Sequence, residues 1–445
     1  MEDVEGLVVG LFAVGLLVCI FLKLPVLYAL ILGFFLFLFY GLKKGYHIKQ
    51  ILSMSWGTIR TVRKILIILL LIGALTAVWR ASGTLAFLVY YATRMMVPQL
   101  FILLSFLLCC GLSVLTGTSF GTSATMGLIC MTMAAAEGVS PVWTGGAVLA
   151  GAFFGDRCSP MSTSALLIAQ ITDTDIYCNL RGMVKTARLP FFLTCGVYLA
   201  AGMGTVTGEV PAVARQIFLL HFRLSWMAVL PAILIIILSL CRVDVRITMV
   251  ASILIGGILC LFLQKMPGME LPGLLAWGYH AEDPAMAAMM NGGGLFSMVT
   301  PVAIVCLSSS YAGIFKGTGL LDVLKNKISR LACRVTPFGS VAVTAALANL
   351  ISCNQTLSII LTYQLCEGMT DDRGKLAVAL ADTAVVIAPL VPWSIAGAVP
   401  IAAIGAPTGC IAAACYLYLL PVCGFFAARR RWKMCPRGLL EEGNT

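Results

Sequence analysis

Long apolar segments recur along the whole chain and determine the class of fold that it can adopt. Only 11% of the 445 residues are charged and 60% are hydrophobic, whereas soluble proteins carry roughly 25% charged residues. A helix needs about 20 mostly apolar residues to cross a bilayer, so we predict an all-α polytopic membrane protein with roughly ten to fourteen membrane segments. The clearest candidates are Leu7–Leu22, Val26–Leu42, Ile65–Val78, Leu100–Leu115, Leu224–Leu240 and Cys410–Ala427.

Basic residues gather in two segments, which predicts the orientation of the chain. One group follows the second apolar segment and the other forms the tail: Lys43, Lys44, Lys49, Arg60, Arg63, Lys64, and Arg429, Arg430, Arg431, Lys433, Arg437. Cytoplasmic loops favour Lys and Arg, so we expect a multi-pass protein of the plasma membrane with both termini in the cytoplasm. The net charge of +11 has the same explanation. We expect the lipid bilayer as a partner and no nucleic acid, and a homodimer is left open.

An internal repeat is indicated by two similar segments. Ala77–Arg94 resembles Gly313–Arg330 without a gap, and the offset between them also pairs Thr118 with Asn354 and Asp156 with Pro392. The alternative is chance resemblance between apolar helices. The loops of the two copies differ in basic residues. The loop of the second copy carries Lys325, Lys327, Arg330 and Arg334, whereas the loop of the first copy carries Arg94. The positive-inside rule then predicts two inverted repeats, a common plan of secondary transporters with broken helices or re-entrant hairpins.

This repeat predicts five regions. They are residues 1–63 (N-terminal spans and a cytoplasmic loop), 64–205 (first transporter repeat), 206–299 (connecting spans), 300–428 (second, inverted repeat) and 429–445 (basic cytoplasmic tail).

Two clusters of uncharged polar residues interrupt the apolar sequence. "TGTSFGTS" (Thr116–Ser123) contains Thr118 and Ser119, and "CNQT" (Cys353–Thr356) contains Asn354 and Gln355. Their hydroxyl and amide oxygens are ligands that hard cations such as sodium prefer. The alternative is that they pack or hydrogen-bond helices together.

Two acidic residues lie in apolar surroundings next to helix-breaking prolines. Asp156 has Arg157 as an available partner, whereas no cation follows Asp382 nearby. An ionisable residue inside a membrane costs several kcal/mol and is a functional candidate by default. The alternatives are a solvated loop for Asp156 and a hydrated helix start for Asp382. Hydroxyl residues that follow the two acids complete the candidate set: Ser159, Ser162, Thr383 and Ser394.

Other site classes are not favoured by the sequence. The 17 cysteines include no Cys-x-x-Cys pair and there are only three histidines, so we expect packing cysteines without a zinc or redox centre. A phosphate-binding glycine loop with Lys-Ser/Thr is also missing from the sequence. We therefore expect no enzyme and no cofactor, and an ion gradient as the energy source.

Three motifs together resemble the NhaC family of sodium/proton antiporters in the ion-transporter superfamily. They are "GTSFGT" (Gly117–Thr122), "GAFFGDRCSPMS" (Gly151–Ser162) and "DTAVVIAPLVPWS" (Asp382–Ser394). The resemblance implies two inverted repeats with interrupted helices and sodium/proton exchange. Family members also include exchangers of organic acids and other solutes. This chain departs from the family pattern at four residues: Arg157 for Lys, Thr163 for Asp, Leu166 for Asn and Ser394 for Asn.

These observations lead to one mechanistic hypothesis and two alternatives. Sodium and protons compete for Asp156 and Asp382, the sodium-binding acids, while neutral oxygens come from Thr118, Ser119, Asn354, Gln355, Ser159 and Ser162. Rocking of the repeats exposes the site to each side in turn. The first alternative is an ion-coupled exchanger of small organic anions or amino acids, bound by Arg157, Arg80, Lys316 or helix N-termini. The second is a membrane protein without transport activity.

Overall fold

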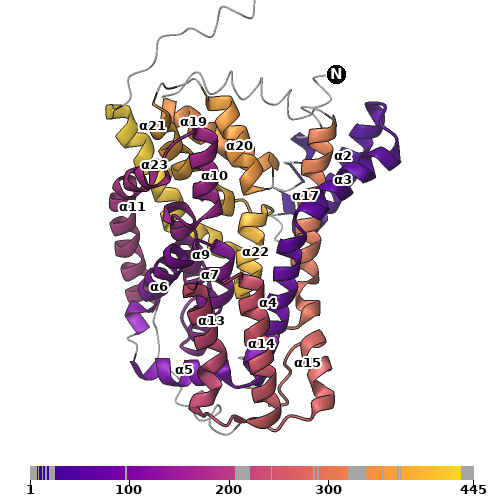
Figure 1. Ribbon diagram of the computed structural model, residues 1–445, viewed down its shortest axis with the longest axis vertical. Helices are drawn as coiled ribbons and strands as arrows, with labels where there is room; N and C mark the ends of the chain where they lie inside the picture. Colours follow the sequence, from indigo (N-terminus) through magenta and orange to yellow (C-terminus); the bar gives the residue numbers. More distant parts are fainter. Residues whose placement is uncertain are drawn as a thin grey trace, which may run out of the picture.

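The computed structural model is all-helical in the part of the chain that it describes (Figure 1). It describes residues 26–431 without 96–97, 206–220, 242, 284–285, 288–289, 319–336, 353, 368–369 and 371, and eight residues between 8 and 19. Most of Leu7–Leu22, the basic residues Lys325 to Arg334 and the tail from residue 432 lie outside this set. The orientation of the termini and the inversion of the repeats therefore stay predictions.

The first half of the chain consists of consecutive helices. They are α2 (Val26–Lys43), α3 (Ile48–Thr61), α4 (Arg63–Ala81), α5 (Thr84–Met95), η1 (Pro98–Leu100), α6 (Phe101–Thr116), α7 (Ser119–Thr122), η2 (Ser123–Gly127), α8 (Leu128–Ala136), α9 (Pro141–Cys158), α10 (Thr163–Thr172) and α11 (Ile176–Thr205). Here η2 is a turn of π-helix that joins α7 to α8, so that Ser119–Ala136 is one continuous helical segment.

The remaining helices form a connection and a second half. The connection contains η3 (Trp226–Val229), α13 (Leu230–Leu240), α14 (Val245–Phe262), η4 (Gly268–Glu270), α15 (Leu271–Trp277) and η5 (Leu295–Met298). The second half contains α17 (Val299–Thr318), α19 (Pro337–Ser352), α20 (Gln355–Cys366), α21 (Arg373–Leu380), the π-helical turn η6 (Ala381–Val385), η7 (Ala388–Leu390), α22 (Ile395–Ile404), η8 (Thr408–Ala413) and α23 (Cys415–Arg431).

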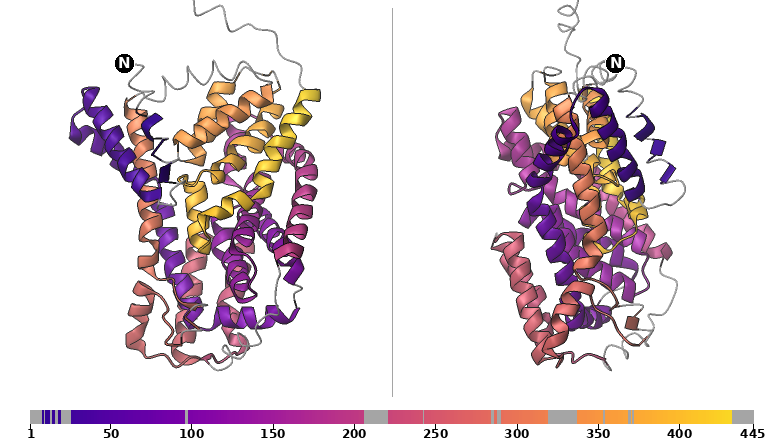
Figure 2. Two further views of the ribbon diagram at one scale, coloured as in Figure 1. Left: turned by 180° about the vertical axis from the view of Figure 1, so that it is seen from behind. Right: turned by 90° about the vertical axis from the view of Figure 1, so that its right-hand side faces the viewer.

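Helices that carry polar motifs lie between two other groups of helices. Figure 1 shows α4, α13, α14 and α15 in the lower part and α10, α19, α20 and α21 in the upper part, with α7, α9 and α22 between them. Helices α2 and α3 pack on α17, and α11 packs on α23; the view from behind in Figure 2 shows α23 running obliquely across the molecule. The breaks that carry the polar motifs thus lie in the interior.

Several helices have the length and composition of membrane spans. Among the described residues these are Arg63–Ala81, Ile176–Gly204, Val245–Phe262 and Leu295–Phe315. A fifth candidate is the pair Arg373–Leu390 and Ile395–Ile404, which is bent by 55° at a short break. Shorter apolar helices, among them α6 and α23, add to these. The structure therefore fits a polytopic membrane protein.

Helix bounds recur between the two halves. Helices α6 and α19 have 16 residues each. Their first residues are as far apart in the sequence as Ala77 and Gly313, and the same separation relates the first residues of α7 and α20. Helices α10 and α22 have 10 residues each, but their starts, like those of α9 and α21, are related by a slightly smaller offset. The predicted pairing of Asp156 with Pro392 is therefore not supported, because the larger offset does not extend to α9.

Glycines on α9 allow it to approach α6 closely. A Cβ atom at Gly151 would lie 2.7 Å from the carbonyl oxygen of Phe106, and one at Gly155 would overlap the backbone of Ser113. Small residues at such crossings let helix backbones approach each other within a membrane. This contact fixes the C-terminal turn of α9, which carries Asp156 and Arg157.

Candidate functional site

Four helix N-termini meet around one cavity of 390 Å³. The lining residues include the first residues of α7, α10, α20 and α22, together with the loop before α7 and the junction of α3 and α4. They are Thr61, Val62, Ile65, Gly117, Thr118, Ser119, Phe120, Asp156, Thr163, Ser164, Asn354, Gln355, Thr356, Ile395 and Ala396. The sequence-predicted residues Thr118, Ser119, Asp156, Asn354 and Gln355 are thus brought together. We call this space the central cavity.

Asp156 accepts hydrogen bonds from neutral donors. Ser162 Oγ donates to its Oδ1 at 2.9 Å, and Ser164 Oγ and Gln355 Nε2 donate to its Oδ2 at 3.2 and 3.0 Å. The side chain is 4% exposed. Among the described residues, no Lys, Arg or His nitrogen forms an ion pair with this carboxylate. The arrangement can therefore accept a cation or a proton, because burial of an unpaired carboxylate is costly.

Three of the four helix N-termini around the cavity are capped by side chains. Ser162 Oγ accepts from the backbone N–H of Ser164 at 3.1 Å, at the start of α10. Asn354 Oδ1 accepts from Thr356 N at 2.9 Å. These contacts satisfy N–H groups that lack a partner in the first turn of a helix.

N-cap residues at corresponding positions of the two halves have similar backbone conformations. Ser394 Oγ caps α22 by accepting from Ala396 N at 3.3 Å, and its φ and ψ of −70° and 143° resemble the −70° and 132° of Ser162. Thr118 and Asn354 have φ and ψ of −132°, 120° and −139°, 123°, respectively. Thr118 differs in that its side chain makes no cap hydrogen bond.

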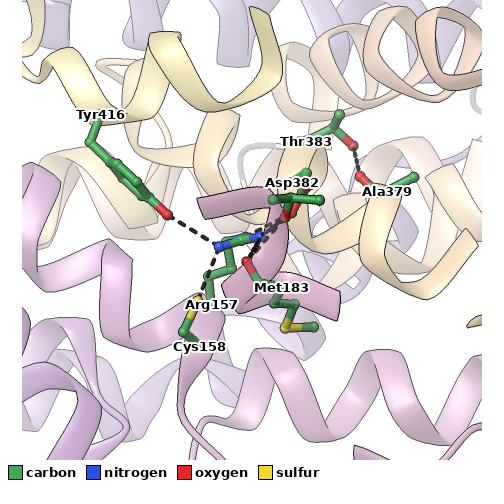
Figure 3. Close-up of polar contacts among 8 residues, drawn as sticks. Arg157, Cys158, Met183, Ala379, Asp382, Thr383 and Tyr416 are labelled. Atoms are coloured by element: carbon green, nitrogen blue, oxygen red, sulfur yellow. Dashed lines mark hydrogen bonds and ion pairs between the residues drawn. The ribbon is translucent and has the colours of Figure 1, made fainter. Parts of the chain in front are cut away.

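Arg157 and Asp382 form a separate, fully buried cluster (Figure 3). Arg157 is 0% exposed and Asp382 is 1% exposed. Arg157 Nε donates to Asp382 Oδ1 at 2.8 Å, and its Nη2 pairs with the same oxygen. Nη1 donates to Tyr416 OH at 3.1 Å and to Cys158 Sγ at 3.0 Å. Nη2 also lies within hydrogen-bond distance of Met183 O, at 2.9 Å, and of Thr186 Oγ1, at 2.6 Å. The pair therefore joins α9 to α11, α23 and η6.

This cluster corrects two expectations from the sequence. Arg157 pairs with Asp382 and not with Asp156, and Asp382 does not lack a cation. Asp382 is also absent from the residues that line the central cavity. The pair could not be predicted from local sequence, because its two residues are 225 positions apart.

The other candidate residues lie around the breaks without lining the cavity. Ser159 Oγ donates to Val114 O at 2.7 Å, and Thr383 Oγ1 donates to Ala379 O at 2.7 Å. Both bonds satisfy backbone carbonyls. The Arg80 guanidinium hydrogen-bonds the carbonyls of Met290 and Asn291, and the side chain of Lys316 lies outside the described residues.

Several contacts of Asp156 and Arg157 were not predicted from the sequence. Ser164 on Asp156 could have been found from its position at the second residue of the helix that Ser162 caps. Tyr416 and Thr186 on Arg157 carry no local signal, since they come from helices far along the chain.

A second cavity of 370 Å³ shares Thr118 with the first. It also contains Lys64, Asp244 and Arg246. Arg246 Nη2 donates to Asp244 Oδ2 at 2.7 Å. Hydrogen bonds from Arg246 lower the pKa of Asp244 to about 2.

Comparisons with known proteins agree with the motifs. A profile of the Na+/H+ antiporter family matches residues 4–175 and 151–427. The malate-2H+/Na+-lactate antiporter of Bacillus subtilis (strain 168) is 27% identical over 87% of this chain and 86% of its own length. The Na+/H+ antiporter NhaC of Alkalihalophilus pseudofirmus is 28% identical over 75% of each chain.

A third relative, the arginine/ornithine antiporter ArcD of Halobacterium salinarum, is 24% identical over 76% of this chain and 73% of its own length. All three relatives are antiporters by name, but their named solutes differ. The resemblance carried by the three motifs is confirmed: the chain belongs to the Na+/H+ antiporter family and is a secondary antiporter.

Proposed function

We propose that this antiporter exchanges sodium for protons across the cell membrane, and that both ions bind in turn at Asp156 in the central cavity. The observation that carries the proposal is the unpaired, buried carboxylate. A carboxylate offers about four lone-pair positions, and Ser162, Ser164 and Gln355 donate three hydrogen bonds to Asp156. One acceptor position is left for a cation or a proton. Sodium and a proton therefore exclude each other, which couples their movements.

Neutral oxygens complete the proposed sodium site. Thr118, Ser119, Asn354 and Gln355 line the same cavity as Asp156. Hard cations favour such oxygen ligands. The structure describes no group of three or more His, Cys, Asp and Glu side chains that could hold a metal ion.

In this proposal Asp382 is not a sodium ligand. Its Oδ1 already accepts two hydrogen bonds from Arg157. Without Asp382, the Arg157 guanidinium would be an uncompensated buried charge. The pair instead fixes α9 and η6 relative to each other, and thereby holds the turn that carries Asp156.

Alternating access by two inverted repeats is the proposed mode of transport. Support comes from the recurring helix bounds and from the matched backbone conformations at Thr118 and Asn354 and at Ser162 and Ser394. Transporters of this plan place their sites between repeats, at discontinuous helices. Helices from both halves line the central cavity: α7 and α10 come from one half, and α20 and α22 come from the other.

Exchange of small organic anions or amino acids coupled to the ions is a second candidate. The volume of 390 Å³ falls within the ~300–1,000 Å³ typical of small-molecule sites, and a sodium ion alone does not fill such a space. The names of two relatives, the malate-2H+/Na+-lactate and arginine/ornithine antiporters, also favour it.

Flux in proteoliposomes tests the proposed exchange. An inward sodium gradient should drive protons out of vesicles that contain the wild-type protein, and Asp156→Asn should abolish this movement. Asp173→Asn is a matched control, because Asp173 is 89% exposed and lies outside the cavity. Equal sodium-driven proton flux in wild type and Asp156→Asn would contradict the proposal.

A further inference from the structure

We propose that the central cavity binds the carboxylate group of a small organic anion at the N-terminus of α7 while a cation occupies Asp156. This inference rests on the proposed function and deepens it, because it names the substrate class that shares the cavity with the ion. Three features of the cavity support it: the uncapped helix end, the free hydroxyl groups beside it, and the charge of the cavity.

The N-terminus of α7, where the continuous segment Ser119–Ala136 begins, has donors without acceptors. Within the described residues, the backbone N–H groups of Ser119, Phe120 and Gly121 meet no carbonyl or side-chain oxygen, and the first bond of the segment is Thr122 N to Thr118 O at 3.1 Å. Capping side chains normally occupy such positions, as they do at α10, α20 and α22. Ser119 and Phe120 line the cavity. Unsatisfied N–H groups at a helix start form a ready-made anion site.

Two hydroxyl groups beside this helix end are also free. Ser119 is 4% exposed, lines the cavity, and makes no side-chain hydrogen bond with any described residue. Thr118 Oγ1 is buried without a hydrogen-bond partner. A hydroxyl group that is buried without a partner costs free energy, so a ligand that accepts its hydrogen would be favoured.

Gly121 maintains this arrangement. A Cβ atom there would lie 2.5 Å from Thr118 Oγ1 and 3.3 Å from a methyl group of Val245. The lack of a side chain therefore lets the Thr118 hydroxyl lie against the first turn of α7.

The charge of the cavity favours an anion once Asp156 is neutralised. Each helix N-terminus carries roughly +0.5 of an elementary charge, and four of them surround the cavity. Asp156 compensates part of this charge. When a sodium ion or a proton neutralises Asp156, the helix ends are left without a counter-charge. One further carboxylate restores the balance, and the volume beside Asp156 gives it room.

Co-occupancy has a thermodynamic consequence. If the cation strengthens binding of the carboxylate, the carboxylate must strengthen binding of the cation by the same factor. The two ligands would then move together in one direction, and the emptied or differently loaded cavity would return. The ion gradient thereby drives transport of the organic anion.

The first experiment measures ligand binding to the purified full-length protein. Thermal stabilisation is recorded with mono- and dicarboxylates of two to six carbons, among them acetate, propionate and succinate, in sodium or in choline buffer. Acetamide, propionamide and succinamide serve as uncharged controls. We expect at least one carboxylate to stabilise the protein, with an apparent affinity about tenfold higher in sodium at a pH where Asp156 is ionised, and no stabilisation by the amides.

The second experiment uses a pair of substitutions at Ser119. Ser119→Ala removes the hydroxyl group, and Ser119→Pro removes the backbone N–H as well. Proline is favoured at the first position of a helix, and Thr118, at φ −132° and ψ 120°, has the conformation that a residue before proline adopts. Both variants are therefore expected to fold. Ile48→Pro is the matched control, since Ile48 is the first residue of α3, is 52% exposed and lies outside the cavity.

The two variants separate an anion site from a cation site. An N–H group binds no cation, so the loss in Ser119→Pro beyond that in Ser119→Ala is specific to anions. We expect carboxylate affinity to fall about tenfold in Ser119→Ala and about a further tenfold in Ser119→Pro, since bonds to charged groups are strong, and to stay at the wild-type value in Ile48→Pro. Equal carboxylate affinities in Ser119→Ala and Ser119→Pro would overturn the assignment to the α7 N-terminus.

The outcomes also distinguish this inference from the proposed function. Sodium-driven proton exchange in the wild type without stabilisation by any carboxylate would overturn the inference and leave the exchange at Asp156 intact. Carboxylate stabilisation of equal size in sodium and choline would overturn co-occupancy. Absence of sodium-driven proton movement, together with sodium-independent carboxylate binding, would overturn both.

Discussion

Asp156 and Arg157 are neighbours on α9, yet their side chains belong to two polar clusters with different chemistry. Asp156 faces uncharged donors and lines a cavity. Arg157 reaches a carboxylate, a phenol, a hydroxyl and a carbonyl in a space where it is 0% exposed. One acid thus keeps an acceptor position for a ligand, whereas the other, Asp382, is occupied by a permanent cation.

The difference shows how a membrane protein can assign separate roles to two buried acids. A fixed guanidinium cannot leave, so Asp382 contributes to the packing of four helical elements. Hydroxyl and amide groups bind a carboxylate without neutralising it, so Asp156 remains a site for an exchangeable ion. Substitutions in and around the two clusters test this separation.

Breaking the buried pair should cost the most stability. Arg157→Leu leaves Asp382 as an uncompensated buried charge, and we expect a loss of about 3–5 kcal/mol in unfolding free energy. The double variant Arg157→Leu/Asp382→Leu should recover most of this loss, because it leaves no unpaired charge. Denaturant unfolding of the two variants in detergent provides the measurement. A single variant as stable as the wild type would show that the pair does not hold the helices.

Filling the contact between α9 and α6 should have the next largest effect. A Cβ atom at Gly155 would overlap the backbone of Ser113, and such overpacking typically costs about 1–3 kcal/mol. Because Gly155 precedes Asp156, the displacement should also weaken sodium binding. Gly57→Ala is the control, since nothing lies within 4 Å of a Cβ atom there. Sodium affinity unchanged in Gly155→Ala would contradict the positioning role of this contact.

Removing a neutral donor from Asp156 should weaken the ion site without displacing a helix. Gln355→Leu deletes the 3.0 Å bond to Asp156 Oδ2. A hydrogen bond to a charged group stabilises that group by about 1.5–3 kcal/mol, so losing it favours the protonated acid over the ionised one that binds sodium. We therefore expect the sodium concentration at half-maximal exchange to rise at least about tenfold. Gln264→Leu removes an amide that bonds Ser82 O at 3.0 Å outside the cavity and should leave this concentration unchanged.

An exposed pair should show the smallest effect. Asp244 caps α14 and accepts from Arg246 N at 2.9 Å, and loss of such a cap costs about 1 kcal/mol. Hydrogen bonds from Arg246 lower the pKa of the Asp244 carboxyl group to about 2, below the usual value of about 3.9 for aspartate. Its contribution is therefore complete above pH 4 and is lost as the pH falls through about 2. The stability difference between wild type and Asp244→Ala should shrink over this range, and a difference that grows would contradict the assignment.

Much of the site, but not its pairing, could be predicted from the sequence. Apolar segments predicted the helical class, and the polar interruptions at Thr118, Asn354 and Asp156 correctly indicated the breaks that meet at the cavity. These signals are local, because Gly, Pro and hydroxyl residues weaken or end a helix at their own positions. The partner of Arg157 could not be predicted, since tertiary packing brings Asp382 to it across 225 residues.

The uncapped end of α7 was also hidden from sequence reasoning. Thr118 is a common capping residue type, and only the structure shows that its hydroxyl group bonds no N–H of the helix. Sequence identifies which residues can cap a helix, whereas the rotamer and the neighbouring Gly121 decide whether they do.

Equilibrium binding of radioactive sodium to the purified protein tests the central claim most directly. We expect saturable binding to the wild type that weakens as the pH falls, retained binding in Arg157→Leu/Asp382→Leu, and none in Asp156→Asn. Sodium binding that survives in Asp156→Asn and disappears in the double variant would assign the ion to the other acid and contradict the account.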